Sequence, residues 1–266
     1  MIPQTHRMIR RSLCAVAAVA GSALARAAWA EEASAAEGAE IPGIAPVHLT
    51  ALTAPARLAD APIAGSTWAG YDGAIQSPRL SVSVEAAVLR RLALVAGADS
   101  SSDASGQFAL RPLVSLRLQV LEQGGAGVDA AAAVTYRQDR FDADGGFFQG
   151  TVALGRRFDR LLLGLNLTYG IDPEGDDHEG EMCASAQVEV KPRLYVGVDG
   201  RYRHDLGSTD PNRAERTRSD SEILAGPTAA YVHGRWAVML EAGVSRVVTS
   251  FTRTAPVALA GYAATF

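Results

Sequence analysis

Cysteine is almost absent from this sequence, which contains only Cys14 and Cys183. We expect Cys14 to be removed with a signal peptide, and one remaining cysteine excludes both an intrachain disulfide and a metal site built from cysteines. A surplus of positive charge is also missing, because the formal net charge is −4. Residues 1–30 hold four arginines and no acidic residue, so their removal takes this charge to −8. Such a balance argues against a nucleic-acid partner.

The N-terminus lacks an apolar stretch long enough to cross a membrane as a helix. Leu13 to Leu24 is apolar, but Arg26 interrupts it before the roughly 20 residues that a spanning helix needs. Three arginines between residues 7 and 11 precede this stretch, and Ala28-Trp29-Ala30 follows it as an A-x-A cleavage site. Together these features predict a secretory signal peptide over residues 1–30.

Residues 31–62 are rich in alanine, proline and glutamate and show no sustained period. This composition predicts a periplasmic linker or loosely ordered arm. The segment could also fold into the rest of the protein as a plug, but a solvated arm is the simpler expectation.

Helical periodicity is missing from residues 63–266, where short runs of alternating apolar and polar residues are separated by turn residues. Such alternation predicts β-strands with one apolar face. In the run 161–169, for example, every odd residue is apolar, while Asn166 and Thr168 stand on the other face. Eleven clear strands are expected, at about 79–89, 92–99, 108–121, 128–138, 146–155, 161–169, 182–190, 194–203, 223–232, 236–248 and 255–266.

The connections between these strands alternate in length. Tight basic turns lie near 90–91, 156–157, 191–193 and 233–235, and longer polar connections lie at 97–107, 139–146, 170–181, 204–221 and 249–254. Aromatic residues stand near both ends of the strands, and charged residues recur in the middle of the polar face. These three features are typical of a membrane barrel with short periplasmic turns, long outer loops, two aromatic girdles and a watery lumen.

The last twelve residues end on an aromatic residue, Phe266, with Tyr262 four positions earlier and Ala258, Ala260 and Ala264 on the same face. This ending resembles the closing strand of bacterial outer-membrane β-barrels. The resemblance is to that porin-like superfamily and to no particular family within it. It implies an all-β transmembrane antiparallel barrel in the outer membrane. It also implies that the barrel-assembly machinery recognises Phe266, and that outer-membrane lipid and lipopolysaccharide surround the protein.

Barrels of this kind have an even number of strands. A twelfth strand at Ile63–Ile75 would complete the eleven, whereas fusing 79–98 into one strand would give ten. Twelve is the better interpretation, because the pair Arg90-Arg91 resembles the other basic turns. The expected organisation is therefore a signal peptide (1–30), a periplasmic arm (31–62) and an outer-membrane barrel (63–266).

The polar face of these strands is the first candidate site. By strand parity it carries nine charged residues into the lumen: Glu85, Arg111, Arg117, Asp129, Arg137, Asp199, Arg201, Arg203 and Glu241. They could line a narrow pore that selects small polar solutes. They could equally pair with one another and fill the interior, as side chains do in small barrels.

Other candidate sites lie in the outer loops. The acidic stretch 171–181 has the oxygen ligands that Ca²⁺ prefers, but its spacing does not match an EF-hand. An outer-membrane enzyme would need a histidine at the outer rim, where His178 and His204 are available. No complete arrangement of nucleophile, base and orienting group accompanies either histidine. The sequence therefore predicts no catalytic residue, no metal site and no cofactor.

Three functions follow from these features. The first is a small outer-membrane channel or transporter for small polar solutes. The second is a non-conducting structural or surface-binding barrel that acts through loops 170–181 and 204–221. An outer-leaflet lipid-modifying enzyme is the third.

Overall fold

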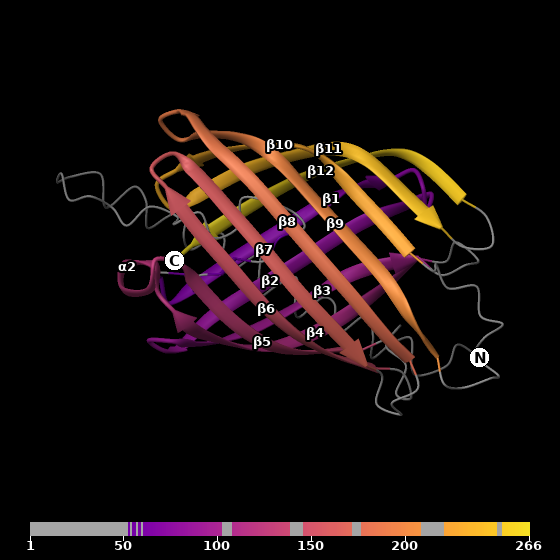
Figure 1. Ribbon diagram of the computed structural model, residues 1–266, viewed down its shortest axis with the longest axis horizontal. Coiled ribbons are helices and arrows are strands. Elements are labelled where there is room, and N and C mark those ends of the chain that lie inside the picture. The colour runs from indigo at the N-terminus through magenta and orange to yellow at the C-terminus, as the bar shows by residue number, and fades with distance from the viewer. Residues whose placement is uncertain are drawn as a thin grey trace, which may run out of the picture. The chain divides into compact units, whose positions relative to one another are not determined.

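A single closed antiparallel barrel of twelve strands dominates the computed structural model (Figure 1). The structure describes residues 53, 55, 56, 58, 59, 61–102, 108–138, 146–171, 177–208, 221–248 and 252–266. The strands are β1 Ile63–Asp72, β2 Ser77–Leu89, β3 Leu92–Ser102, β4 Phe108–Leu121, β5 Asp129–Gln138, β6 Gly146–Phe158, β7 Leu161–Ile171, β8 Asp177–Lys191, β9 Leu194–Ser208, β10 Ser221–His233, β11 Trp236–Val248 and β12 Thr252–Thr265.

Each strand pairs with its neighbours in sequence, and β1 closes the barrel by pairing with β12 from Ala64↔Thr265 to Asp72↔Val257. Closure leaves none of these strands as an open sheet edge. The prediction of twelve strands is confirmed, and the ten-strand alternative is wrong because Arg90 and Arg91 form the turn between β2 and β3. The strand expected at Ile63–Ile75 is β1.

Short turns join the strands at one end of the barrel, which we call the short-turn end. Asp159, Arg193 and Gly234 take left-handed backbone conformations there, with φ of 49°, 71° and 54°. Tight hairpins favour such positive φ values because they match the twist of the flanking strands. A four-residue helix, α2 (Gln123–Ala126), lies between β4 and β5 at the same end. No helix in the described part of the chain is long and apolar enough to cross a membrane.

We call the opposite end the long-loop end. Five of its connections, at 103–107, 139–145, 172–176, 209–220 and 249–251, lie outside the described residues. Several strands extend further toward this end than alternation predicted: β8 begins at Asp177 instead of about 182, and β9 continues to Ser208 instead of about 203. Apart from Leu206, both faces lack large apolar residues in these extensions, so the sequence shows no clear alternation there.

The apolar face of the strands lies on the outside of the barrel. Leu116, Val134 and Leu240, for example, are 51%, 63% and 58% exposed. The opposite face turns inward, because its side chains reach partners on strands that are not neighbours. Glu85 on β2 and Arg117 on β4 form an ion pair although β3 lies between them.

Candidate functional site

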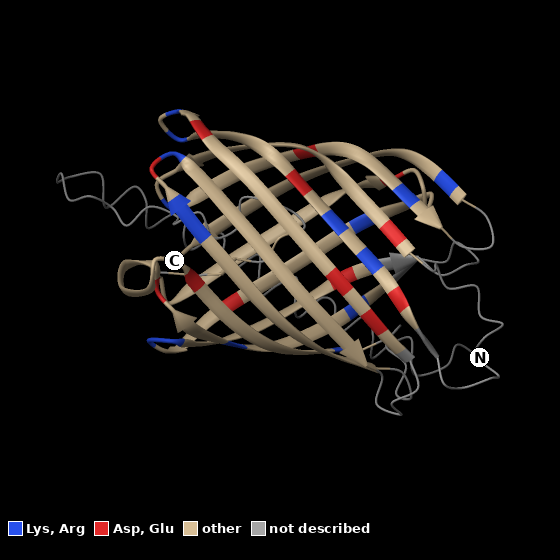
Figure 2. Cartoon of the chain, in the orientation of Figure 1, with Lys and Arg blue, Asp and Glu red and all other residues tan. Residues whose placement is uncertain are grey.

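The strand register places all nine of the charged residues singled out from the sequence on the inner face. Figure 2 shows how charged positions recur along the middle of the strands. The nine do not form one cluster. The structure brings some of them together in pairs with residues that parity had not selected, and it gives others a purely local partner.

Near the short-turn end, Glu85 and Arg117 form a buried ion pair. Asp129 accepts a hydrogen bond of 2.8 Å from the backbone N–H of Gln123, so it holds the turn that contains α2. Asp199 and Glu241, each 2% exposed, lie further along the inner wall on β9 and β11. Asp199 accepts hydrogen bonds from Thr53 Oγ1 at 2.8 Å and from the N–H of Gly200 at 2.9 Å.

Toward the long-loop end, Arg111 and Arg137 share one carboxylate. Arg111 Nε lies 3.1 Å from Asp99 Oδ1, and Arg137 Nη2 lies 3.4 Å from Asp99 Oδ2. These contacts tie β3, β4 and β5 together on this part of the inner wall.

A second network at this end reaches across the lumen. Arg201 on β9 lies 2.5 Å from Glu222 on β10, and Arg79 on β2 pairs with the same carboxylate. Arg79 also pairs with the fully buried Asp72 at 2.6 Å. Since β1, β12 and β11 separate β2 from β10, the pair Arg79–Glu222 spans the interior as a chord. Arg203 pairs nearby with Glu179, which also accepts a 2.6 Å hydrogen bond from Gln149.

Sequence reasoning missed five of these ion-pair partners: Asp72, Arg79, Asp99, Glu179 and Glu222. Each stands near a strand end, where turn-like composition hid the alternation. Three of them lie inside the expected strands 63–75, 79–89 and 92–99, and Glu179 and Glu222 lie three residues and one residue before the next expected strands. Parity applied at the strand ends and just beyond them would have found all five. Which partner each one meets depends on which strand lies opposite, and alternation carries no such information.

The inner wall is polar on only part of its circumference, unlike the polar lumen expected from the sequence. Over β10, β11, β12 and β1 it carries a buried apolar cluster that includes Trp68, Leu224, Met239, Val257 and Leu259. Trp68 covers Gly261 on the neighbouring strand, where an added Cβ would come within 2.6 Å of the indole ring. Packed apolar side chains therefore fill this side of the lumen, and they offer a polar solute few hydrogen-bond partners.

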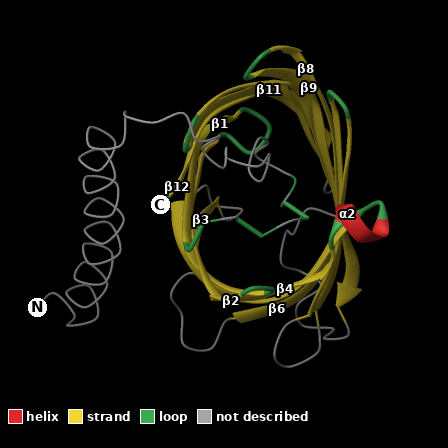
Figure 3. Ribbon diagram, turned by 90° about the vertical axis from the view of Figure 1, so that its left-hand side faces the viewer, coloured by secondary structure: helices red, strands yellow, loops and turns green. Residues whose placement is uncertain are grey.

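The described part of the segment that precedes β1 lies inside the barrel at the short-turn end. We call its described part, residues 53, 55, 56, 58 and 59, the inner arm. Figure 3, seen from the short-turn end, shows loop-coloured pieces of this segment within the ring of strands. The sequence analysis favoured a solvated arm for residues 31–62, and the inner arm differs from that expectation.

Hydrogen bonds fix the inner arm to side chains of the inner wall. The N–H of Leu58 donates to Gln119 Oε1 at 2.8 Å, and Gln119 Nε2 donates to the carbonyl of Ala56 at 3.1 Å. The N–H of Ala59 donates to Glu85 Oε1 at 3.1 Å, and Arg117 donates to the carbonyl of Pro55. Because irregular backbone needs partners when buried, these side chains satisfy groups that the barrel ladder cannot reach.

A pair of glycines makes room for the inner arm. Gly155 on β6 and Gly164 on β7 are register partners on the inner face. A Cβ at Gly155 would lie 2.9 Å from Ala56 Cβ, and a Cβ at Gly164 would lie 2.9 Å from Thr53 Cγ2. Any larger residue at either position would push the inner arm away from the wall.

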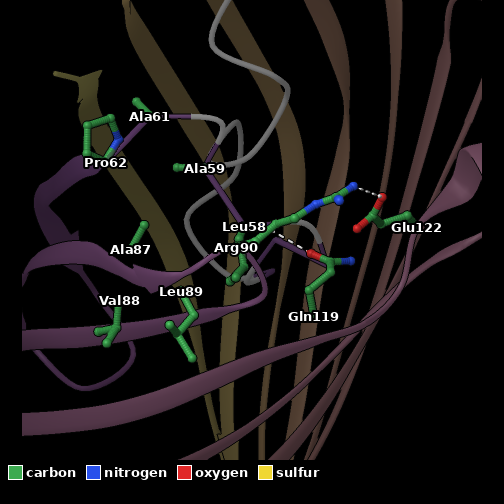
Figure 4. A pocket seen from close by; sticks show the side chains of 10 residues that line it. All are labelled: Leu58, Ala59, Ala61, Pro62, Ala87, Val88, Leu89, Arg90, Gln119 and Glu122. Carbon is green, nitrogen blue, oxygen red and sulfur yellow. Dashed lines mark hydrogen bonds and ion pairs between the residues drawn. The ribbon is translucent and has the colours of Figure 1, made fainter.

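A cavity of about 510 Å³ lies beside the inner arm, between Leu58–Pro62 and the ends of β2 and β4 (Figure 4). Arg90, Gln119 and Glu122 supply polar groups to its lining, and Ala87, Val88 and Leu89 apolar ones. The cavity opens at the short-turn end, so the space around the inner arm is not completely packed.

The histidines considered for catalysis face outward. Tyr169 Oη lies 2.7 Å from His178 Nδ1, and the ring of His204 stacks on Tyr202 with 6.1 Å between ring centroids. These contacts place both histidines among aromatic residues of the outer surface. In the described residues no group of three or more His, Cys, Asp or Glu side chains is placed to hold a metal ion, and residues 172–176 of the acidic stretch lie outside that part.

No protein-family model matches the chain, and no curated protein matches it. Among solved structures, the NanC porin superposes with a TM-score of 0.53 at 8% identity, over 76% of this chain and 100% of that chain. LpxR from Salmonella typhimurium gives 0.47 at 10% identity, over 77% and 100% of the two chains. The outer membrane channel DcaP of Acinetobacter baumannii gives 0.41 at 12% identity, over 72% and 63%. Only the first score is high enough to show a shared fold, which is a porin-like closed barrel.

Proposed function

We propose that this protein is an outer-membrane channel for small polar solutes, with its short turns in the periplasm and its long loops outside the cell. The inner arm narrows the passage at the periplasmic side. A porin shares the fold, and the surface and the lumen of this chain each add support.

The outer surface is suited to lipid. Large apolar side chains are exposed along every strand from β2 to β11, far more than a soluble monomer presents in one continuous band. Tyr136, Phe148, Tyr169 and Tyr202 stand on the outward face toward the long-loop end, and Phe158, Tyr231 and Trp236 stand on it toward the short-turn end. Two such rings of aromatic side chains are typical of the two interfaces of a membrane barrel.

The observation that carries the channel proposal is a polar wall surrounding a segment that does not belong to the barrel. From β2 to β9 the inner face presents charged and amide side chains, and several of them are occupied by backbone groups of the inner arm. Withdrawal of that segment would leave a hydrated groove along this wall. Glu85 and Arg117 also pair with each other, so this wall would stay polar and internally paired without the inner arm.

A non-conducting barrel is the second candidate, and one contact favours it. The ion pair between Arg79 and Glu222 crosses the lumen near the long-loop end, so both this chord and the inner arm obstruct a straight path. Neither candidate assigns a catalytic residue, and His178 and His204 are placed in the aromatic surface instead.

Swelling of vesicles that contain the exported chain, residues 31–266, tests the proposal. We expect slow swelling with small sugars or amino acids, and faster swelling when residues 53–59 are replaced by glycine and serine of equal length. A larger sugar that remains excluded serves as the leak control. Vesicles that swell no faster with the replaced segment than protein-free vesicles would support the non-conducting barrel.

A further inference from the structure

The short-turn end carries a ring of positive charge that the channel does not use. Eight basic residues stand in its turns and strand ends, all of them exposed: Arg90, Arg91, Arg156, Arg157, Arg160, Lys191, Arg193 and Arg235. Four acidic residues accompany them: Glu122, Asp129, Asp159 and Glu189. We call these eight basic residues the basic rim. Figure 2 shows blue segments at the turns of the left-hand end.

This concentration is not a consequence of composition. The eight basic residues of the rim and the four acidic residues beside them together carry a formal charge of +4, whereas residues 31–266 as a whole carry −8. Ion pairs neutralise only part of it. Arg91 lies 3.2 Å from Glu122, with Arg90 at 3.9 Å from the same carboxylate, and Arg157 lies 3.6 Å from Glu189.

The unpaired charge gathers on the arc from β6 to β11. In the described part of the chain, Arg156, Arg160, Lys191 and Arg235 have no carboxylate within ion-pair distance. Arg193 Nη1 lies 2.9 Å from His233 Nδ1 rather than from an acid. The same arc carries the outward aromatic residues of this end, Phe158, Tyr231 and Trp236.

Cations and aromatic rings are mixed at one level of the outer surface. The guanidinium of Arg156 lies 4.2 Å from the ring centroid of Phe158, and His233 packs against Trp236 at 5.4 Å. Aromatic belts lie at the lipid headgroups. Because Arg156 points from the same outward face as Leu154 and Phe158, its charge sits where headgroup phosphates lie and a soluble protein cannot reach.

We propose that the basic rim, on its arc from β6 to β11, binds anionic phospholipid headgroups of the leaflet next to the short turns and selects them over zwitterionic lipid. This inference rests on the proposed membrane location. Lysine and arginine near an anionic membrane surface each strengthen binding, by roughly fivefold at moderate salt.

Trp236 is a native reporter for this contact. It shares the outward face of Val238 and Leu240, while Trp68, the other tryptophan of the exported chain, is buried on the inner face. In a Trp68→Phe background, Trp236 fluorescence is measured in phosphatidylcholine vesicles that contain either brominated phosphatidylglycerol or brominated phosphatidylcholine at equal fractions. Bromine quenches only the tryptophan it touches, so the ratio of the two signals gives the local lipid preference.

We expect brominated phosphatidylglycerol to quench Trp236 more strongly than brominated phosphatidylcholine does. This lipid preference should fall about fivefold in Arg235→Gln. It should disappear when Arg156, Arg160, Lys191 and Arg235 are all changed to glutamine. Arg246→Gln is the matched control, because Arg246 is exposed on the same strand toward the long-loop end. Equal quenching by both lipids, or an unchanged preference in the fourfold variant, would overturn the inference and turn attention to a soluble anionic partner. Folded protein that neither lipid quenches would instead refute the membrane location, and the inference with it.

Discussion

Buried charged side chains give the inner wall of this barrel its character. Glu85 and Arg117 pair inside the wall, and the same two side chains hold backbone groups of the inner arm. Removing one partner of a buried ion pair leaves an uncompensated charge, whereas removing both is often close to neutral. These residues therefore couple the stability of the barrel to the attachment of the inner arm.

Arg117→Met tests this coupling. We expect it to lower the free energy of unfolding by about 3–5 kcal/mol, because Glu85 remains buried without its partner. Adding Glu85→Gln should recover most of the loss, since the amide still accepts a hydrogen bond from Ala59. Urea unfolding of the protein in lipid vesicles measures both values. Simple additivity of the two single changes would contradict a coupled pair.

The glycine pair gives a second prediction. Gly155→Val should displace the inner arm, because even its Cβ would meet Ala56 at 2.9 Å. Gly150→Val is its control on the same strand, since nothing lies within 4 Å of a Cβ there. Trypsin cleavage after Arg57, read by mass spectrometry, should become faster in the first variant and stay unchanged in the second. Equal protection from trypsin in both variants would mean that the position of the inner arm does not depend on the glycine pair.

Among the strands, the repeat of apolar residues made the barrel predictable. Every second residue must be apolar on the outward face, so the alternation of 161–169 alone marks β7. In β12 the inward positions Val257 and Leu259 are apolar as well. The same reasoning gave the inward parity of the charged residues. The contact of the inner arm with Gly155 and Gly164 could not be predicted, and neither could the ion pair Arg79–Glu222. Both depend on which segments meet across the lumen. The apolar wall under Trp68 was hidden for a related reason: strands that are apolar on both faces lose their alternation.

A lipid-facing strand surface predicts a specific pattern at Leu167, which is 50% exposed in the middle of β7. Leu167→Arg should impair insertion by about 2–4 kcal/mol, because an arginine would face the bilayer midplane. Leu167→Ala at the same position should have a much smaller effect. Folding yield into vesicles, scored by heat-modifiable migration, distinguishes the two. A barrel whose outer face meets water would tolerate both changes equally.

The whole molecule combines three surfaces with different chemistry. The outside is apolar between two aromatic rings, and the short-turn end is positively charged. The inner wall is mainly polar from β2 to β9, and from β10 to β1 it carries the apolar cluster beside the buried acids Asp72, Glu222 and Glu241. The inner arm occupies the polar side of the interior at the short-turn end.

Single-channel conductance of the exported chain in planar bilayers tests this account most directly. We predict small or infrequent steps for the natural chain, and frequent, larger and ion-selective steps when residues 53–59 are replaced by glycine and serine. Gly150→Val should behave as the natural chain does. A correctly folded, heat-modifiable barrel that stays silent with and without the inner arm would contradict the account, because its lumen would then be closed by the wall itself.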